Sequence, residues 1–312
     1  MNSGPLSRRE RFTVAVYRAG WSTVRRLPEA AAYRLFDLIA DLAWWRRVGS
    51  VRRLEANLAR VCPDLGQAQL RRLARAGMRS YLRYWCDSFR LPDWDEERIT
   101  GSVRVVGDAP VRAALGAGRG VVMFLGHLGN WDHAGAWSTL RLAPVTTVAE
   151  RLRPEAVFEQ FVAFRERLGM RVIPLGGHEV FRQLMSVLRQ GGFVPLLADR
   201  DLTEGGVEVS FFGEPARMAL GPAALALQTG AALHPVSIHY ERRPAGWGIV
   251  ITWHEEVPAP QGRVRGAAST RQAVQDMTQA CADVLADAIR RHPQDWHMLQ
   301  RVFTADLRSQ DT

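Results

Sequence analysis

From residue 100 onward, short runs of apolar residues alternate with stretches of helical spacing, and this alternation limits the possible folds more than any other feature. It is typical of a largely parallel β-sheet with crossover helices. The expected strands cover residues 120–126, 145–150, 170–175, 193–199, 207–212, 233–240 and 248–254. The expected helices cover residues 131–141, 154–168, 178–190, 219–229 and 268–291. The sequence therefore predicts an α/β fold with a central, mostly parallel mixed sheet flanked by helices.

The first hundred residues predict helices instead of strands. One apolar stripe comprises Phe12, Val16, Ala19 and Val24, and a stronger stripe after Pro28 comprises Leu35, Leu38, Ile39, Leu42 and Trp45. Two further helices are expected between about residues 66 and 90, before Pro92. We therefore divide the single structural domain into an N-terminal amphipathic helical subdomain, residues 1–95, and an α/β core, residues 96–312.

The charge distribution favours an anionic partner for the helical subdomain. The chain has 41 basic and 32 acidic residues, and residues 1–60 hold twelve arginines against five acidic residues. Trp44 and Trp45 are followed directly by Arg46 and Arg47, a pattern typical of helices that lie in a membrane interface. The alternatives are a solvated basic face and apolar stripes that pack on the rest of the domain. Nucleic acid is not expected, because the basic residues are not interleaved with exposed aromatic residues on a recognisable module.

Several other classes of protein are excluded by simple patterns. No segment offers 18 uncharged apolar residues, and no secretory signal is visible, so we expect no membrane span and a cytoplasmic location. Cys62, Cys86 and Cys281 are odd in number and far apart, which argues against a disulfide framework or a thiolate zinc site. His127 and His133 lack the helical zinc spacing, and there is no HExxH motif. We therefore expect neither a metal nor a bound cofactor.

Ionisable residues gather where the expected strands end. In an open parallel sheet, ligands bind beyond the carboxyl ends of the strands. The residues at these ends are His127 after the first strand, Glu150 at the end of the second, Gly176 and Gly177 after the third, and Asp199, Arg200 and Asp201 after the fourth. Ionisable groups collected at one crevice are typical of enzymes.

The sharpest motif within this group is His127 followed by Asp132. We expect the glycine-containing turn between them to fold Asp132 onto one ring nitrogen of His127, which leaves the other nitrogen as a general base. The alternative is a buried histidine held by a nearby aspartate for structural reasons. No serine or cysteine nucleophile accompanies the pair, so the base is expected to activate a hydroxyl group of the substrate.

Two further pairs of residues allow two interpretations each. Arg200 and Arg217 are candidates for binding phosphate, or they form ordinary ion pairs with acidic residues, namely Asp199, Asp201 or Glu214. Phe211 and Phe212, with the apolar helix that follows, are candidates for lining an acyl-chain groove. Phenylalanines with that spacing also occur in ordinary cores.

These residues resemble the lysophospholipid and lipid A acyltransferase superfamily, whose mark is a histidine with an acidic residue five positions later. Within it, the chain resembles the actinobacterial enzymes that acylate phosphatidylinositol mannosides. The matching strings cover residues 129–132, 147–152, 164–169, 198–203, 207–209, 211–215, 229–233 and 292–300. The His127 and Asp132 element alone marks only the superfamily, whereas the longer strings are more specific.

The resemblance implies an acyl-CoA-dependent O-acyltransferase. It would transfer palmitoyl from coenzyme A to a mannose hydroxyl of phosphatidylinositol mono- or dimannoside, without an acyl-enzyme. It would act as a peripheral protein on the cytoplasmic face of the inner membrane. Alternatives are another glycolipid acceptor of the lipid A type, or a lipid-binding protein without catalytic activity.

The resemblance also assigns roles to single residues. It implies that His127 is the base, that Asp132 is the second member of the motif, and that Asp199 partners the histidine. In the mannoside enzymes a glutamate stands where this chain has Asp199. It also implies that Glu150, Arg165 and Arg200 line the acceptor side of the site. The other candidates for substrate binding are Asn130, Asp201, Phe211, Phe212 and Arg217.

Overall fold

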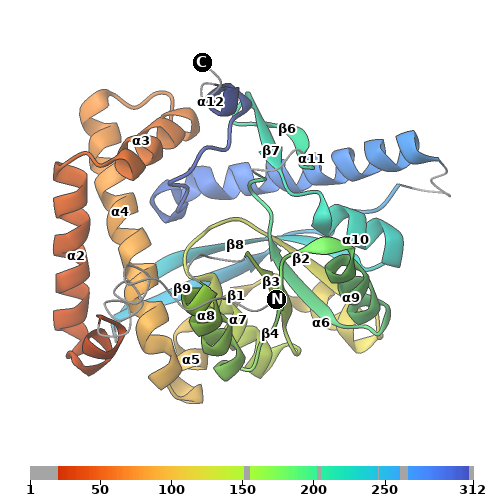
Figure 1. Ribbon diagram of the computed structural model, residues 1–312, viewed down its shortest axis with the longest axis horizontal. Helices are drawn as coiled ribbons and strands as arrows, with labels where there is room; N and C mark the ends of the chain where they lie inside the picture. Colours follow the sequence, from red (N-terminus) through yellow and green to blue (C-terminus); the bar gives the residue numbers. More distant parts are fainter. Residues whose placement is uncertain (1–19, 151–154, 202–204, 245, 261–265, 309–312) are drawn as a thin grey trace.

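A five-stranded sheet forms the centre of the protein (Figure 1). The computed structural model describes residues 20–150, 155–201, 205–244, 246–260 and 266–308. In spatial order the strands are β1 (Val103–Val106), β9 (Gly246–Trp253), β8 (Ala232–Arg243), β2 (Val121–Leu125) and β5 (Phe193–Leu197). Neighbouring strands are parallel except for the antiparallel β8 and β9 pair. The predicted α/β class with a mostly parallel sheet flanked by helices is confirmed.

A second parallel pair of strands lies beside β5. It consists of β3 (Thr146–Ala149) and β4 (Arg171–Pro174). A single parallel bridge joins Val145 to Phe193 of β5, and the Thr147 hydroxyl donates a hydrogen bond to the Pro195 carbonyl at 2.8 Å. The carboxyl ends of β2, β5 and β3 therefore lie along the same edge, as the strand pattern predicts.

Helices and one β-hairpin surround these strands. The helices of the core are α5 (Glu96–Gly101), α6 (Ala109–Gly116), α7 (Trp131–Arg141), α8 (Glu155–Arg167), α9 (Gly177–Arg189), α10 (Gly221–Thr229), α11 (Ala267–Arg291) and α12 (Thr304–Arg308), with short 3₁₀ helices η1 (Leu91–Asp93) and η2 (Pro293–Asp295). The hairpin pairs β6 (Val207–Phe211) with β7 (Glu214–Met218). The predicted strands and helices of the core are present, but β1, β7 and the short helices α5, α6 and α12 were not predicted. β1 has only four residues, and β7 contains Pro215 and Arg217, which break the apolar signal.

The described part of the N-terminal region is helical. It contains a helix that covers the described residues 20–26, followed by α2 (Glu29–Trp45), α3 (Gly49–Val61) and α4 (Gln67–Arg90). The prediction of two helices between residues 66 and 90 is wrong, because α4 is one continuous helix. It passes through Gly77, where the helix packs close to Leu54. Of the first predicted stripe, Val24 is buried, and Phe12, Val16 and Ala19 lie outside the described residues.

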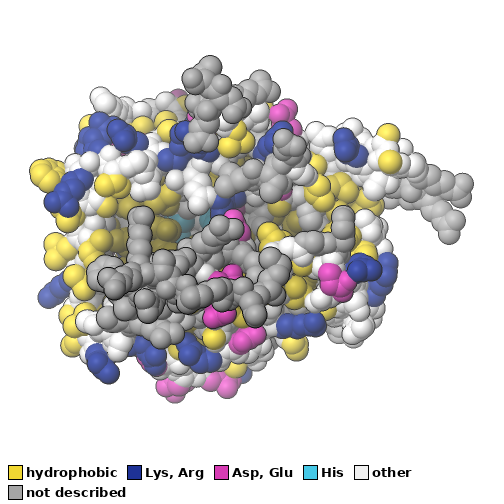
Figure 2. Space-filling view, viewed as in Figure 1, with side chains coloured by type: hydrophobic (Ala, Val, Ile, Leu, Met, Phe, Trp, Pro, Cys, Tyr) yellow, Lys and Arg dark blue, Asp and Glu magenta, His cyan; other side chains and the backbone are white. Residues whose placement is uncertain are grey.

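Helix α2 buries one face and exposes the other. Ala32, Phe36 and Ala40 are buried against α4 and its neighbours. The large apolar residues of the second predicted stripe face outward and are exposed, with Leu38 at 66% and Trp45 at 70%; the others are Leu35, Ile39 and Leu42. Figure 2 shows apolar side chains with arginines between them along the edge of the molecule that α2 forms in Figure 1. Among the described residues, no helix combines the length and the apolar character that crossing a bilayer requires.

Candidate active site

The end of β2 brings His127 against Asp199 at the end of β5. The two strands are parallel and in register, with Leu125 opposite Leu197, so residues two positions beyond each strand lie side by side. His127 Nδ1 lies 2.6 Å from Asp199 Oδ1, and the His127 backbone N–H donates to Asp199 Oδ2 at 2.9 Å. The carboxylate therefore holds both the ring and the backbone of the histidine.

The contacts of Asp199 fix where the proton of the imidazole sits. Asp199 is fully buried, and burial acts to raise its pKa. Attraction to His127 and hydrogen bonds from His127 and Trp296 outweigh burial, so the pKa of Asp199 lies below its usual value. An ionised carboxylate can only accept hydrogen bonds, so Nδ1 of His127 carries the proton. Nε2 then holds the lone pair and has no partner among the described residues, while the His127 side chain is 19% exposed.

The expectation that Asp132 folds onto His127 is wrong. Helix α7 begins at Trp131, so Asp132 lies in its first turn, where its carboxylate meets two other side chains. Its Oδ1 accepts from Arg165 Nε at 2.7 Å, and its Oδ2 accepts from the Tyr84 hydroxyl at 2.8 Å. The spacing of the two motif residues in the sequence keeps them close along the chain, but it does not determine where the Asp132 side chain points.

Asp132 and Arg165 form a buried ion pair between α7 and α8. Burial acts to lower the pKa of Arg165, but attraction to Asp132 is stronger, so the pKa is raised and the guanidinium stays charged. Asp132 is 2% exposed and the Arg165 side chain 15% exposed. Removing only one partner of such a buried ion pair strongly lowers the stability of the protein, because the other charge stays buried without a counterion.

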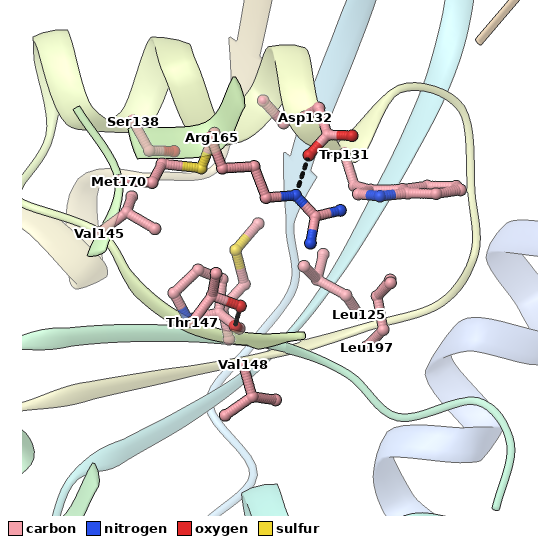
Figure 3. A pocket seen from close by; sticks show the side chains of 14 residues that line it. Leu125, Trp131, Asp132, Ser138, Val145, Thr147, Val148, Arg165, Met170 and Leu197 are labelled. Atoms are coloured by element: carbon pink, nitrogen blue, oxygen red, sulfur yellow. Dashed lines mark hydrogen bonds and ion pairs between the residues drawn. The ribbon is translucent and has the colours of Figure 1, made fainter. Parts of the chain in front are cut away.

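An apolar cavity lies beside this ion pair (Figure 3). Trp131 lies at one side of the cavity, and its ring packs edge-on against the His127 ring with centroids 5.5 Å apart. The Arg165 side chain reaches in from α8. The remaining walls come from the sheet, α7 and the chain before β4, namely Met123, Leu125, Ala134, Gly135, Ser138, Val145, Thr147, Val148, Met170, Pro195 and Leu197.

Glu150 and Arg200 pair with each other at the same edge. The exposed Glu150 carboxylate lies 3.6 Å from an Arg200 terminal nitrogen, and the Arg200 side chain is 19% exposed. The partner of Arg200 is therefore neither Asp199 nor Asp201, the two acidic neighbours considered from the sequence. Asp201 and Arg217 are joined through the backbone, because the Asp201 N–H donates to the Arg217 carbonyl at 2.9 Å. Glu214 pairs with Arg60 of α3.

Three of the residues predicted to bind substrate, Asn130, Phe211 and Phe212, pack within the protein, and the first two are fully buried. Asn130 is fully buried, where its side-chain oxygen caps α7 by accepting from the His133 N–H and its amide nitrogen donates to Asp87. Phe211 is fully buried against Trp296 and Phe303. Phe212 is partly buried and lies under the Arg290 guanidinium, 5.2 Å from it. Phe211 is therefore a core residue, which is the alternative that the sequence left open, and neither phenylalanine lines the cavity beside Trp131.

Three residues of the site were missed by the sequence analysis. Tyr84 comes from α4, Trp131 from the start of α7, and Trp296 from the segment after η2, where its indole N–H donates to Asp199 at 3.0 Å. Tyr84 and Trp296 lie far along the chain from the motif, although Trp296 falls within one of the matching strings. Among the described residues, no group of three or more His, Cys, Asp and Glu side chains is placed to hold a metal ion.

The chain belongs to a known family of transferases. The family described as bacterial lipid A biosynthesis acyltransferase matches residues 5–305, which is nearly the whole chain, so the protein is an enzyme that transfers acyl groups. Two relatives are named phosphatidylinositol mannoside acyltransferase. The relative from Mycobacterium tuberculosis is 45% identical over 295 residues, 93% of this chain and 88% of its own. The relative from Mycolicibacterium smegmatis is 43% identical over 293 residues, 93% and 91% of the two chains. The resemblance that the sequence motifs predict is confirmed.

The buried ion pair yields a prediction about stability. Asp132→Asn keeps the shape of the side chain but leaves the Arg165 charge without a buried counterion, so the free energy of unfolding should fall by about 3 kcal/mol. Urea denaturation of the variant and the parent measures the difference. Adding Arg165→Met to Asp132→Asn should recover part of the loss, because the unpaired charge is gone. An Asp132→Asn protein as stable as the parent would contradict the assignment.

Proposed function

We propose that this protein transfers a long acyl chain, palmitoyl, from its coenzyme A thioester to a mannose hydroxyl of a phosphatidylinositol mono- or dimannoside. The observation that carries the proposal is the His127 ring, held at Nδ1 by Asp199 with Nε2 left as a base at the partly open edge of the sheet. The family match supports acyl transfer, and the names of the relatives support the mannolipid acceptor.

The proposed mechanism is direct transfer. His127 Nε2 takes the proton of the sugar hydroxyl as the hydroxyl oxygen attacks the thioester carbonyl carbon. The tetrahedral intermediate collapses with cleavage of the carbon–sulfur bond, and the leaving thiolate takes the proton from the imidazolium. Asp199 stabilises the imidazolium between these two steps, because it is a buried carboxylate in contact with Nδ1. No side chain of the enzyme is acylated in this scheme.

The acyl chain is proposed to lie in the apolar cavity beside Trp131 and the Asp132–Arg165 ion pair. Its walls are mostly aliphatic side chains of the sheet and α7, which suit an alkyl chain because they offer contact without unpaired polar groups. Trp131 lines the cavity and also packs against the His127 ring. An acyl chain in the cavity would therefore have its thioester end near the base. Arg200, Glu150, Asp201 and Arg217 remain proposed contacts for the polar parts of the substrates.

Helix α2 is proposed to bind the protein to an anionic membrane surface, as a peripheral protein on the cytoplasmic face. Its exposed face carries large apolar residues, and the nearby Arg34, Arg46 and Arg47 are also exposed. The negative charge of Asp41, on the same helix, is balanced by hydrogen-bonded ion pairs with Arg75 and Arg79 of α4. A wide apolar stripe bordered by arginines suits an interface of acyl chains and lipid phosphates.

Removal of the base should abolish most of the activity. His127→Ala should lower kcat by roughly 10²-fold to 10⁴-fold, the usual contribution of a general base. The measurement is release of coenzyme A from palmitoyl-coenzyme A with and without a mannosylated phosphatidylinositol. His254→Ala is the matched control, since His254 is also partly buried and hydrogen-bonded, to Ser237 at 3.0 Å. Near-normal turnover by His127→Ala would overturn the proposed mechanism.

Narrowing the cavity should change the preference for chain length. Val148 lies in β3 and lines the cavity, so Val148→Phe should reduce kcat/KM for palmitoyl-coenzyme A by about tenfold or more, with a smaller effect on a short acyl donor. Val207→Phe, at a partly buried valine of the β6 hairpin, serves as the control. Equal losses for long and short donors would place the acyl chain elsewhere.

Polar substitutions on α2 should weaken membrane binding. The double variant Leu38→Gln and Leu42→Gln should bind vesicles of phosphatidylcholine and phosphatidylinositol about tenfold or more weakly, because two exposed apolar side chains no longer enter the interface. Leu140→Gln, at an exposed leucine of α7, should bind as the parent does. Sedimentation of protein with vesicles gives the affinities. Unchanged binding by the α2 variant would exclude this face as the membrane contact.

A further inference from the structure

The segment that follows η2 lies along the loop that carries His127. The Gly129 N–H donates to the Asp295 carbonyl at 2.9 Å, and the His297 N–H donates to the His127 carbonyl at 2.8 Å. An antiparallel bridge joins Leu128 to Trp296 between these two bonds. Residues 127–129 and 295–297 therefore pair like two short strands.

Gly129 permits this close approach of the loop to its surroundings. Its φ is +54°, and a Cβ atom at this position would meet the Ile238 carbonyl oxygen at 2.8 Å. The loop after β2 thus passes between β8 and the 295–297 segment with no space for a side chain at this point. The backbone of His127 cannot shift far without disturbing both neighbours.

The 295–297 segment is itself fixed to the rest of the protein. The buried Asp295 carboxylate accepts from the Ser80 hydroxyl of α4 at 2.5 Å and from the Tyr240 N–H of β8 at 3.0 Å. One residue beyond the segment, Asn57 of α3 donates to the Met298 carbonyl at 2.8 Å. Two helices and the central sheet therefore hold the segment in place.

Trp296 extends from this segment to the carboxylate that partners His127. The Trp296 side chain is fully buried, and its indole Nε1–H donates to Asp199 Oδ2 at 3.0 Å. Oδ2 also accepts the His127 backbone N–H, so two donors hold one carboxylate oxygen and leave Oδ1 facing the imidazole. The rings of Phe211 and Phe212 pack against the indole, with centroids 5.8 and 5.7 Å away, and prevent it from turning aside.

We propose that Trp296 is a positioning residue that sets the orientation of Asp199, and through it the ring of His127. The proposal rests on the proposed function of His127 as the base. A second donor on Oδ2 both fixes the rotation of the carboxylate and draws negative charge away from Oδ1. Without the indole N–H, His127 alone would hold the carboxylate, through its backbone N–H and its ring, and the carboxylate would carry more charge toward the imidazole.

The test is the pH dependence of kcat/KM for Trp296→Phe, which keeps an aromatic ring and removes the donor. We expect kcat to fall by about tenfold, because the carboxylate that orients the imidazole loses one of its three hydrogen bonds and is held less firmly. We also expect the acid limb of the profile to move up by about half a pH unit, because a more strongly charged Oδ1 stabilises the imidazolium form of His127. Loss of packing alone would lower activity without moving this limb.

Trp253→Phe provides the matched control. Trp253 is another buried tryptophan of the same core, but its indole N–H has no hydrogen-bond partner in the described part of the chain. Its replacement should leave the acid limb in place. If Trp296→Phe fails to fold, replacement of Trp296 by 3-benzothienylalanine keeps the shape of the indole and puts sulfur where the N–H is, and the same shift is expected.

The outcomes separate this proposal from the one on which it rests. Parent and His127→Ala proteins are measured in parallel, and full activity of His127→Ala would reject the role of the base itself. If His127→Ala is inactive, an unshifted acid limb in the Trp296 variants, with a loss of kcat no larger than in Trp253→Phe, would reject the positioning role of Trp296 alone.

Discussion

The buried carboxylate of Asp199 is the constraint on which the site depends. An ionised group that is fully buried is costly unless its oxygens are satisfied, and here three hydrogen bonds satisfy them. These bonds come from the side chain and the backbone of His127 and from Trp296. The ends of β2 and β5 and the segment after η2 must therefore meet at one point. The parallel register of β2 and β5 brings the first two together, and η2, which ends directly before Trp296, leads into the third.

Much of the fold follows from the order of apolar runs in the sequence. Runs such as residues 121–125 and 193–197 are short, uncharged and separated by helical patterns, and a parallel sheet with crossover helices is the arrangement that buries them. The strands that were not predicted, β1 and β7, are short, and their exposed or polar residues alternate with buried or partly buried ones. β1 forms by pairing with β9, and β7 forms by pairing with β6. The sequence of each short strand alone does not indicate these pairings.

The site was predictable where it depends on strand ends and unpredictable where it depends on direction. His127 and Asp199 each follow a predicted strand, so their position at one edge of the sheet can be read from the sequence. Their direct pairing was implied only by the resemblance, and the adjacency of β2 and β5 that brings them together is seen in the structure. Asp132 was given the wrong partner, because its direction is set by the start of α7 and by Tyr84 and Arg165, which come from other helices. Trp296 approaches from a segment 97 residues beyond Asp199, and neither spacing nor periodicity connects the two.

The tautomer of the neutral His127 ring determines whether Nε2 can act as the proposed base. Correlation spectra that link the ring nitrogens to the ring protons of ¹⁵N-labelled histidine distinguish the two neutral tautomers, with the His127 signal assigned by its absence in His127→Ala. We predict that neutral His127 carries its proton on Nδ1, from which it donates a hydrogen bond to Asp199, and that Nε2 is unprotonated. A neutral ring protonated on Nε2 would have no lone pair at the open edge of the sheet and would contradict the proposed base.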